Sequence, residues 1–454
     1  MSGWGLTART RATVHRPRVV DEVVGLLRDG PERGAIARGM GRAYGDAAQN
    51  AGGTVIDTSG LDAVRDLDLA AGRATVEAGL SLDRLISLVL PLGWFPDVVP
   101  GTRFVTVGGA IASDIHGKNH HRDGAFGDHV LWLELVTPEG ERIECSPGRE
   151  PEVFAATTGG MGLTGVVVAA TVRLSRIETS WMRVDTERAA DLEDALARME
   201  ERDEEYRYSV AWIDCLARGS QLGRSVLFRG DHATLDELPP ERRHSPLSAP
   251  PPPQLAAPPW VPHGLLRRST VAAFNEVYFR RAPRLQRGRL ESLERFFFPL
   301  DAVRGWNRMY GRRGFVQYQL VVPFGAEDAL RAAIERLSGA RCASFLAVLK
   351  RFGRERGLIS FPMPGWTLAL DVPADAPGLA PLLDGLDELV AGAGGRVYLS
   401  KDSRLRPDLL AQMYPRLPEW REVRARLDPQ ERMRSDLGRR LGLVAGRSPA
   451  EAAA

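Results

Sequence analysis

The residue types best suited to chemistry gather in one stretch of the chain, from Pro100 to Asp128. This stretch contains six glycines and the histidines His116, His120 and His121. Glycine lets a backbone approach a ligand closely and permits positive φ angles. A run of exposed backbone N–H groups can bind phosphate. A single glycine here would be explained by an ordinary turn, but the run as a whole indicates the wall of a cofactor site.

The histidine cluster also suggests an alternative, a metal site. Lys118 and Arg122 are interleaved with the histidines, and their positive charges oppose a divalent ion. We find no cysteine or carboxylate spaced to complete a four-ligand set. We therefore expect no metal here.

A second glycine-rich turn, Gly39–Asp46, follows a short apolar strand predicted at Gly34–Arg38. A strand followed directly by such a turn is a context in which backbone amides enclose a phosphate. The segment Gly160–Gly165 also fits the spacing G-x-G-x-x-G. That motif marks a dinucleotide site only where it opens a helix, and neither turn is followed by a helical pattern. A nicotinamide-binding Rossmann site is therefore not expected.

The elements that must position these turns are a mixture of helices and strands. Apolar spacing and the N-cap residue Ser81 predict two helices, Val19–Arg28 and Ser81–Leu90. β-Branched runs predict strands at Thr54–Asp57 and Arg73–Glu77, and a hairpin formed by Leu131–Thr137 and Arg142–Glu144. The first 175 residues lack the regular strand–helix alternation of a doubly wound fold, so we predict an α+β domain.

From about residue 180 the pattern changes. Helical spacing is found at Asp191–Glu201 and Pro323–Ser338. Strand-like runs are Tyr206–Ile213, Ser225–Arg229, Phe315–Val322, Cys342–Phe352 and Thr367–Val372. Between them, Leu238–His263 is too rich in proline to form a sheet ladder. After Val397 we predict an arginine-rich helix that ends near Leu443.

Composition sets the remaining limits. A chain of 454 residues is long enough for two or three domains. A net charge of +2 argues against bulk electrostatic binding of nucleic acid. Cys145, Cys215 and Cys342 lie too far apart for a disulfide framework or a paired-cysteine metal site. Neither a secretory signal nor a membrane-spanning apolar run is expected from the sequence.

Seven motifs occur in a fixed order, at residues 34–50, 100–121, 159–167, 314–319, 360–366, 398–404 and 428–440. Together they resemble the vanillyl-alcohol-oxidase-like family of FAD-dependent oxidoreductases, and within it the members that oxidise a polyprenyl-phosphate-linked ribose. The similarity runs from Gly3 to about Leu443. A single motif of this kind would mean little, whereas seven in the same order are specific.

The resemblance implies a fold with a two-lobed, α+β FAD-binding domain of the vanillyl-alcohol-oxidase/PCMH type and an antiparallel-sheet substrate domain. The implied domains are residues 1–178 for FAD, residues 179–395 for the substrate domain, with a proline-rich insertion at about 238–270, and residues 396–454 returning to the FAD domain. Many relatives attach FAD covalently through a histidine in the first turn. Tyr44 stands at that position here, so we expect non-covalent FAD.

The resemblance also implies which residues bind FAD. They are Arg38, Gly39, Met40, Gly41, Arg42, Ala43, Tyr44, Gly45, Asp46, Gln49, Asn50, Gly101, Thr106, Val107, Gly108, Gly109, His116, Gly117, Lys118, Asn119, Val167 and Tyr398.

The expected catalytic residues are Lys401, His116, Lys118 and Gln319. Lys401 occupies the position of the family lysine, where its charge suits a reduced flavin and where burial would let it act as a base. Gln317 and Gln319 alternate on a strand and should face the same side. The full set of expected substrate-binding residues is Gln317, Gln319, Tyr310, Trp212, Lys350, Thr367 and Ala369. Relatives carry a cysteine where Ala369 stands, which should remove reactivity toward thiol-seeking inhibitors but not activity.

The leading functional hypothesis is oxidation of the 2′-hydroxyl of polyprenylphosphoryl-β-D-ribose to the 2′-keto sugar, the first half of an epimerisation to the arabinose donor for cell-wall arabinan. An NAD(P)H-dependent keto-reductase would act next. The alternatives are an oxidase of soluble alditols, sugars or aldonolactones, and a flavin-binding scaffold without turnover. A cytoplasmic or membrane-associated location is expected from the missing signal, and the periplasmic side of the membrane from the resemblance.

Overall fold

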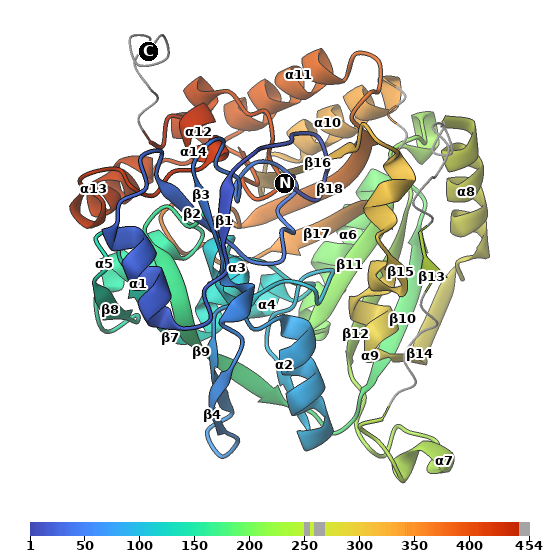
Figure 1. The fold of residues 1–454 in the computed structure, drawn as a ribbon. Coiled ribbons are helices and arrows are strands. Elements are labelled where there is room, and N and C mark those ends of the chain that lie inside the picture. Colours follow the sequence, from blue (N-terminus) through green and yellow to red (C-terminus); the bar gives the residue numbers. More distant parts are fainter. Residues whose placement is uncertain (249–254, 258–267, 341, 343, 345, 445–454) are drawn as a thin grey trace.

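The computed structural model describes residues 1–248, 255–257, 268–340, 342, 344 and 346–444 (Figure 1). Residues 249–254 and 258–263 of the proline-rich segment predicted at 238–263, and residues 343 and 345 of the strand predicted at Cys342–Phe352, lie outside these ranges. Within them the protein is an α+β fold that contains three main sheets.

The first sheet is small and parallel, with the strand order β1-β3-β2. Its strands are β1 (Thr13–His15), β2 (Ala35–Arg38) and β3 (Thr54–Asp57). Helix α1 (Val20–Arg28) precedes β2 and buries Val20, Val23 and Leu27, three residues on one helical face. The two predicted strands and the predicted helix are confirmed, and they hold the first glycine turn at the end of β2.

The second sheet has the order β4-β5-β9-β7-β8, with β6 paired to β9. The strands are β4 (Val64–Asp68), β5 (Arg73–Glu77), β6 (Trp94–Pro96), β7 (Val130–Val136), β8 (Arg142–Cys145) and β9 (Val166–Arg176). The helices around it are α2 (Leu82–Val89), α3 (Val107–Ala112), α4 (His120–Asp123) and α5 (Pro151–Thr157). Ser81 caps α2 by accepting from Arg84 N at 3.2 Å, as predicted. The predicted hairpin is formed by β7 and β8, and β9 directly follows Gly165.

The third sheet is antiparallel and has the order β14-β10-β12-β11-β17-β18-β16-β19. Its strands are β10 (Trp181–Ala189), β11 (Tyr208–Ile213), β12 (Ser225–His232), β14 (Leu285–Ser292), β16 (Phe315–Pro323), β17 (Ala347–Phe352), β18 (Gly365–Pro373) and β19 (Arg396–Val397). Helices α6 (Leu192–Arg202), α10 (Glu327–Gly339) and α11 (Leu379–Gly392) pack against it. Figure 1 shows α10 and α11 beside β16 and β18.

Two boundaries predicted in this region are wrong. The helix predicted from Pro323 begins at Glu327, because β16 continues to Pro323, which pairs with Gly365 of β18. The strand predicted from Cys342 begins at Ala347. Strands β10 and β14 and helices α8 (Arg268–Arg281) and α11 were not predicted.

Four further short elements lie in the chain between β12 and β16. They are α7 (Pro240–Arg243), β13 (Leu255–Ala256), α9 (Leu293–Phe297) and β15 (Val303–Arg304). The expectation that the proline-rich segment forms no sheet ladder is wrong at one point, because β13 pairs with β15 over two residues that are not proline.

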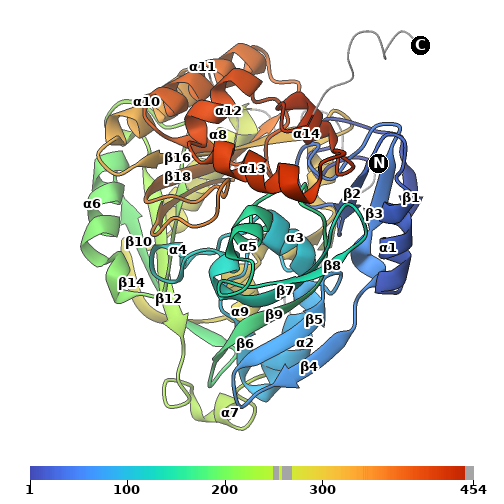
Figure 2. The same ribbon diagram turned by 90° about the vertical axis from the view of Figure 1, so that its left-hand side faces the viewer.

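The C-terminal segment returns to the first glycine turn. Instead of one helix it forms three, α12 (Pro407–Met413), α13 (Leu417–Leu427) and α14 (Asp436–Arg440), because Pro415 and Pro429 interrupt the helical run (Figure 2). Arg440 binds both carboxylate oxygens of Asp46, at 2.8 and 3.0 Å. The C-terminal segment therefore stabilises the turn after β2.

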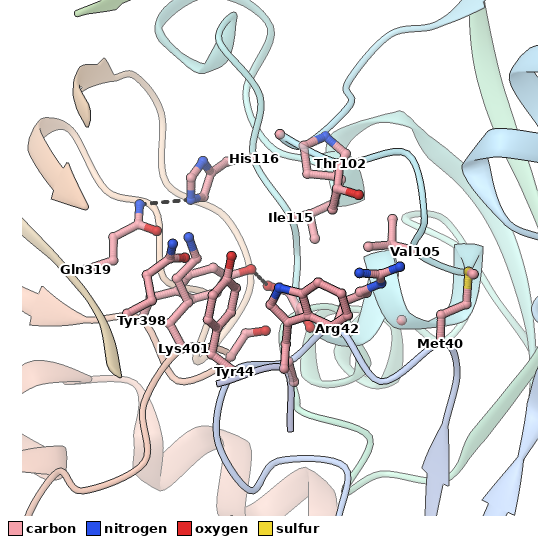
Figure 3. Close-up of a pocket in the computed structure, with 18 of the residues that line it drawn as sticks. Met40, Arg42, Tyr44, Thr102, Val105, Ile115, His116, Gln319, Tyr398 and Lys401 are labelled. Atoms are coloured by element: carbon pink, nitrogen blue, oxygen red, sulfur yellow. Dashed lines mark hydrogen bonds between the residues drawn. The ribbon is translucent and has the colours of Figure 1, made fainter. Parts of the chain in front are cut away.

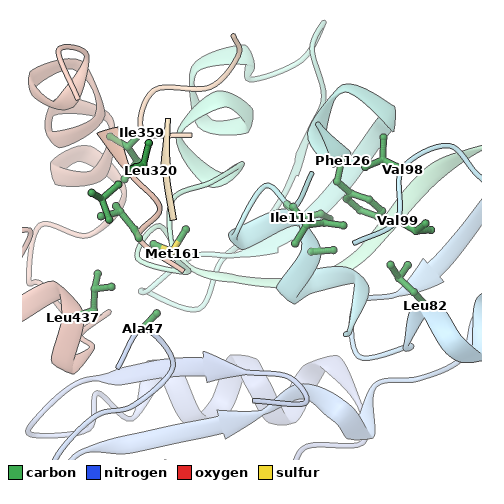
Figure 4. Close-up of a cluster of buried hydrophobic side chains, with 14 of the residues drawn as sticks. Ala47, Leu82, Val98, Val99, Ile111, Phe126, Met161, Leu320, Ile359 and Leu437 are labelled. Atoms are coloured by element: carbon green, nitrogen blue, oxygen red, sulfur yellow. The ribbon is translucent and has the colours of Figure 1, made fainter. Parts of the chain in front are cut away.

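One continuous core joins these parts. Figure 4 shows Ala47, Met161, Leu320 and Leu437 near one another, although they come from four distant segments. We propose the divisions 1–178, 179–395 and 396–454 as domains, the first of which ends between β9 and β10.

Candidate active site

A cavity of about 430 Å³ lies between the glycine-rich segments, the antiparallel sheet and the start of the C-terminal segment. Figure 3 shows the side chains that enter it from each of these parts. The turn after β2 contributes Met40, Arg42 and Tyr44, and the segment after β19 contributes Tyr398 and Lys401. The sequence-predicted residues thus converge on one site from distant parts of the chain.

The turn after β2 is fixed from behind by its arginines. Arg38 donates to Ser2 O at 2.7 Å and to Ala48 O at 3.0 Å. Arg42 donates to Phe104 O at 3.1 Å, and its guanidinium lies 3.8 Å from the centre of the Trp4 ring. Within the described residues, the backbone N–H groups of residues 40–43 have no hydrogen-bond acceptor. Such a set of free donors suits an anionic ligand.

The second glycine-rich segment packs tightly against this turn. Thr106 caps α3 by accepting from Gly109 N at 3.1 Å. A Cβ on Gly39 would lie 2.1 Å from Thr106 Oγ1, so no larger residue fits there without movement. A Cβ on Gly101, in contrast, would meet no atom within 4 Å. The backbone is therefore close-packed on one side and open toward the cavity on the other.

Most of the predicted site residues line this cavity. They are Arg38, Gly39, Met40, Gly41, Arg42, Ala43, Tyr44, Gly101, Thr106, Gly108, Gly109, His116, Gly117, Lys118, Val167, Trp212, Gln317, Gln319, Lys350, Ala369, Tyr398 and Lys401.

Eight predicted residues lie outside the lining and have structural partners instead. Gly45 packs on the backbone of Asp402, and Asn119 binds Asp97 O and Asp123. Thr367 contacts Gln319 and so supports the lining from behind. Asp46 pairs with Arg440, Gln49 donates to Thr10, and Asn50 donates to Gly34 O. Val107 is buried, and Tyr310 stacks on Phe315.

Lys401 lies beside Tyr44, with its Nζ 5.2 Å from the centre of the ring. Burial lowers the pKa of Lys401 to about 8, and the charge of Asp371 acts in the opposite direction. Burial likewise raises the pKa of Asp371 to about 7. Asp371 accepts a hydrogen bond from Gln317, directly opposite it on β16. Lys401 is thus a cation that can lose its proton within the physiological pH range.

His116 is held in a chain of hydrogen bonds. The Thr367 hydroxyl donates to Leu320 O at 2.8 Å, so its oxygen accepts from Gln319 Nε2 at 3.0 Å. The same Gln319 nitrogen lies 3.0 Å from His116 Nε2. Because an amide nitrogen only donates, His116 Nε2 is the acceptor. A neutral imidazole with this arrangement carries its proton on Nδ1.

This assignment determines the state of Lys350. His116 Nδ1 lies 2.9 Å from Lys350 Nζ. Burial lowers the pKa of His116 well below its usual value, so the ring is neutral. A protonated Nδ1 needs an acceptor, and an ammonium group has no lone pair. Lys350 is therefore an uncharged amine in this arrangement. Burial and two neighbouring lysines lower the pKa of Lys350 far below its usual value, in agreement.

The remaining histidines do not converge with His116. His120 Nδ1 accepts from Gly353 N at 3.1 Å. His121 Nε2 lies 3.1 Å from two carbonyl oxygens, and His129 binds Asp97 at 2.9 Å. Tyr398 donates to Ser113 O at 2.7 Å and stacks on Phe361. Within the described residues, no group of three or more histidines, cysteines or carboxylates is placed to hold a metal ion.

Comparison with known proteins bears on this site in two ways. The FAD binding domain family matches residues 12–146, which include both glycine-rich segments. Over 450 residues, 98% of this chain and 97% of the other, the chain is 41% identical to decaprenylphosphoryl-β-D-ribose oxidase of Mycolicibacterium smegmatis. The chain belongs to the decaprenylphosphoryl-β-D-ribose oxidase family. It is an FAD-dependent oxidase.

Two other relatives mark the range of the similarity. An uncharacterised protein from the mprA 5′ region of Streptomyces coelicolor is 45% identical over 374 residues, 80% of this chain and 100% of that protein. Cytokinin dehydrogenase 8 of Oryza sativa subsp. indica is 29% identical over 191 residues, 37% of this chain and 36% of that protein.

The site fits the FAD that this oxidase family uses. The free amides of residues 40–43 suit its pyrophosphate, and the opening at Gly101 leaves room for a ligand against the backbone. Gln317 Oε1 and Gln319 Oε1 are buried and have no donor among the described residues, so a ligand with hydroxyl or N–H groups would satisfy them.

Of the aromatic part of the cavity, the sequence predicted only Trp212. Val210 and Phe228 are opposed on β11 and β12, and both line the cavity. Strand alternation points to Phe228, because Phe228 lies on the same face of β12 as Val226, and Val226 pairs with the predicted site residue Trp212. Tyr278 belongs to α8, which was not predicted. The other missed aromatic and apolar lining residues include Trp4, Phe297, Leu300, Trp306, Leu346 and Val348.

Proposed function

We propose that this enzyme oxidises the 2′-hydroxyl of a polyprenylphosphoryl-β-D-ribose to the 2′-keto sugar. The observation that carries the proposal is the set of side chains that line the cavity. The lining combines the glycine-rich wall, a polar group of Gln317, Gln319, His116 and Lys350, and an aromatic part. The name of the M. smegmatis relative supports the same substrate.

The polar group can perform the protein's share of an alcohol oxidation. Bound FAD would supply the acceptor for the hydride that leaves the sugar carbon. The free Oε1 atoms of Gln317 and Gln319 can accept hydrogen bonds from sugar hydroxyls and fix the ring. Lys401 supplies a positive charge next to the ring of Tyr44. An amine with a lowered pKa is a suitable proton acceptor, and Lys350 is placed to take the hydroxyl proton on Nζ.

The proton transfer requires one local change at Lys350. In the structure its lone pair accepts from His116 Nδ1, and Nζ donates to Gly117 O at 3.2 Å. Rotation about the Cε–Nζ bond turns the lone pair toward a bound hydroxyl. The ammonium that results keeps Gly117 O as its acceptor, and the His116 Nδ1–H, which loses the Lys350 lone pair, would donate to the substrate oxygen.

The second candidate function, oxidation of soluble alditols, sugars or aldonolactones, needs no apolar part in the cavity. The aromatic lining formed by Trp212, Phe228, Tyr278 and Phe297 therefore favours the lipid-linked substrate. The third candidate function, a flavin-binding scaffold without turnover, gives no role to the polar side chains of Gln317, Gln319, His116 and Lys350.

The proposed reaction also implies a partner activity. A 2′-keto sugar must be reduced to reach the epimeric alcohol, so we propose that an NAD(P)H-dependent keto-reductase acts next. We also propose contact with a membrane surface, because the substrate carries a polyprenyl chain. Among the described residues, no helix combines the length and apolar character needed to cross a bilayer.

Anaerobic bleaching of the flavin tests the proposal. The holoenzyme is mixed with a polyprenylphosphoryl ribose, free ribose, an alditol or an aldonolactone, and the loss of flavin absorbance is followed. We expect rapid bleaching with the lipid-linked ribose only. Faster bleaching with a soluble alditol would establish the second candidate. Gln319→Leu, which keeps the size of the side chain but removes the amide, should retain FAD and lose most of the bleaching rate.

A further inference from the structure

The use of lysine in this chain is unusual. Lys118, Lys350 and Lys401 are its three lysines, and all other basic side chains among its 60 lysines and arginines are arginine. All three lysines line the same cavity, although they come from three separate segments. Arginine remains charged in proteins and carries a wide planar head, whereas lysine is compact and loses its proton when buried. The cavity is therefore the place where this chain uses an amine instead of a guanidinium.

The three amines lie in a definite order. Lys401 is beside Tyr44 at one end. Lys350 lies between the other two: its Nζ donates to the carbonyl oxygen of Gly117, the neighbour of Lys118, at 3.2 Å, and the charge of Lys401 acts on its pKa. In contrast, the charged neighbour that matters for Lys401 is Asp371, and for Lys118 it is Glu291. In Figure 3, His116 and Gln319, which belong with Lys350, lie on the same side of the cavity as Tyr398 and Lys401.

Lys118 stands where the polar part of the cavity meets the aromatic part. Its Nζ donates to Phe296 O and lies 5.9 Å from the centre of the Phe297 ring, which lines the cavity. Its carbonyl accepts from Ser209 N at 2.9 Å, next to the lining residue Val210. Beyond Val210 the lining continues with Phe228, and with Trp212 and Tyr278, whose ring centres are 4.7 Å apart.

Lys118 also has unused binding capacity. An ammonium group has three N–H donors, and Phe296 O takes one of them. In the part of the chain that the structure describes, none of the three lysines has a carboxylate within 4.0 Å. Lys350 is uncharged, and Lys401 lies beside Tyr44 at the far end, so Lys118 is the charged lysine nearest the aromatic part.

We propose that Lys118 binds the phosphate of the lipid-linked sugar. This deepens the proposed function and rests on it, because that substrate has the same order of groups as the cavity: sugar, phosphodiester, apolar chain. With the sugar between Lys401 and Lys350, the phosphate reaches Lys118, and the first part of the chain lies against the aromatic side chains. A charge-assisted hydrogen bond in a shielded site provides both affinity and selectivity for a phosphorylated substrate.

The proposal has a definite dependence on pH. Burial lowers the pKa of Lys118 to about 7 in the free protein. A bound phosphodiester would raise that pKa, since an opposite charge favours the ammonium form. Binding of the phosphodiester is therefore tightest below about pH 7 and weakens as the pH rises through the pKa of the complex.

Two ligands without ribose test the proposal on the holoenzyme. The first is a methyl prenyl phosphodiester, which stays a monoanion throughout this pH range, and the second is the matching prenyl alcohol. Binding is followed by the change in flavin absorbance. In Lys118→Met the phosphodiester should bind about 10- to 100-fold more weakly, the range for a hydrogen bond to a charged group, and the alcohol as before. Lys118→Arg keeps the charge and should retain most of the affinity. Equal weakening of both ligands, or of neither, would overturn the proposal.

A second readout uses the wild-type protein. Reductive methylation with ¹³C-formaldehyde labels only three lysines and the N-terminus, so each amine gives a separate NMR signal. The signal that Lys118→Met removes should shift when the phosphodiester is added and stay still with the alcohol. An unmoved signal would contradict phosphate binding at Lys118. Oxidation of the lipid-linked ribose is measured separately, so a protein that binds the phosphodiester through Lys118 but oxidises another substrate would refute only the proposed function.

Discussion

Replacement of Lys401 by methionine should leave FAD bound and slow substrate oxidation by about 10²–10³-fold. The side chain lines the cavity beside Tyr44, and within the described residues no carboxylate lies within 4.0 Å to neutralise it. A unit charge about 4 Å from a developing negative charge interacts with it by about 4 kcal/mol at an effective dielectric constant of about 20. Removal of one such preorganised group typically costs about 10²–10³ in rate. The two estimates agree.

The same residue should set the alkaline limit of the reaction. Because the pKa of Lys401 is lowered to about 8, its charge is present below that pH and is lost above it. The oxidation rate of the wild type should therefore fall as the pH rises through about 8. Lys401→Arg cannot lose its charge, so this limb should disappear in the arginine variant, even if its larger head lowers the rate at every pH.

Stopped-flow bleaching under anaerobic, saturating conditions measures both effects, with the flavin content of each variant as the control for folding. A loss of less than about tenfold in Lys401→Met, or about 1.4 kcal/mol, would mean that another group supplies the charge. An unchanged alkaline limb in Lys401→Arg would refute the assignment of that limb to Lys401.

Three shorter predictions follow from neighbouring residues. Lys350→Arg replaces a neutral amine by a permanent cation and so removes the proton acceptor, and the rate should fall by about 10²–10⁴-fold; a rate close to wild type would show that Lys350 is not the proton acceptor. Acid precipitation should release all the flavin, because Tyr44 stands where relatives carry a linking histidine; flavin that stays on the denatured chain would disprove this. Among the described residues, Ala369 lines the cavity and no cysteine does, so a thiol-seeking nitroaromatic inhibitor should give a mass adduct with Ala369→Cys and none with the natural protein.

The glycine turns and the strand carrying Gln317 and Gln319 were predictable because their signals are local. A positive φ or a close backbone approach demands glycine at its own position, as at Gly39 against Thr106. Alternation along β16 places Gln317 and Gln319 on the cavity side, while Tyr318 points to the helices and donates to Asp387 at 2.9 Å. The family resemblance then identified the cofactor.

The meeting of His116 with Lys350 could not be predicted in the same way. The two residues are separated by 234 positions, and the contact depends on how β17 packs against the segment after α3. The uncharged state of Lys350 follows only from the complete hydrogen-bond chain through Thr367 and Gln319. Likewise, β10 and β14 pair with each other at one edge of the sheet, and the exposed strand β14 shows little apolar alternation.

The proposed reactive groups therefore depend on the contact between the first part of the chain and the antiparallel sheet. His116 belongs to the glycine-rich segment, whereas Gln319 and Lys350 belong to β16 and β17. The same contact is stabilised away from the cavity by Arg207 of the sheet, which binds Asp97 at 2.9 Å and Asp123 at 2.7 Å. The turns that suit FAD lie wholly in the first part and in the tail that supports it through Arg440. Cofactor binding and proton transfer thus rest on different contacts: the first can persist when the sheet shifts, while the second requires His116, Gln319 and Lys350 to stay within hydrogen-bond distance.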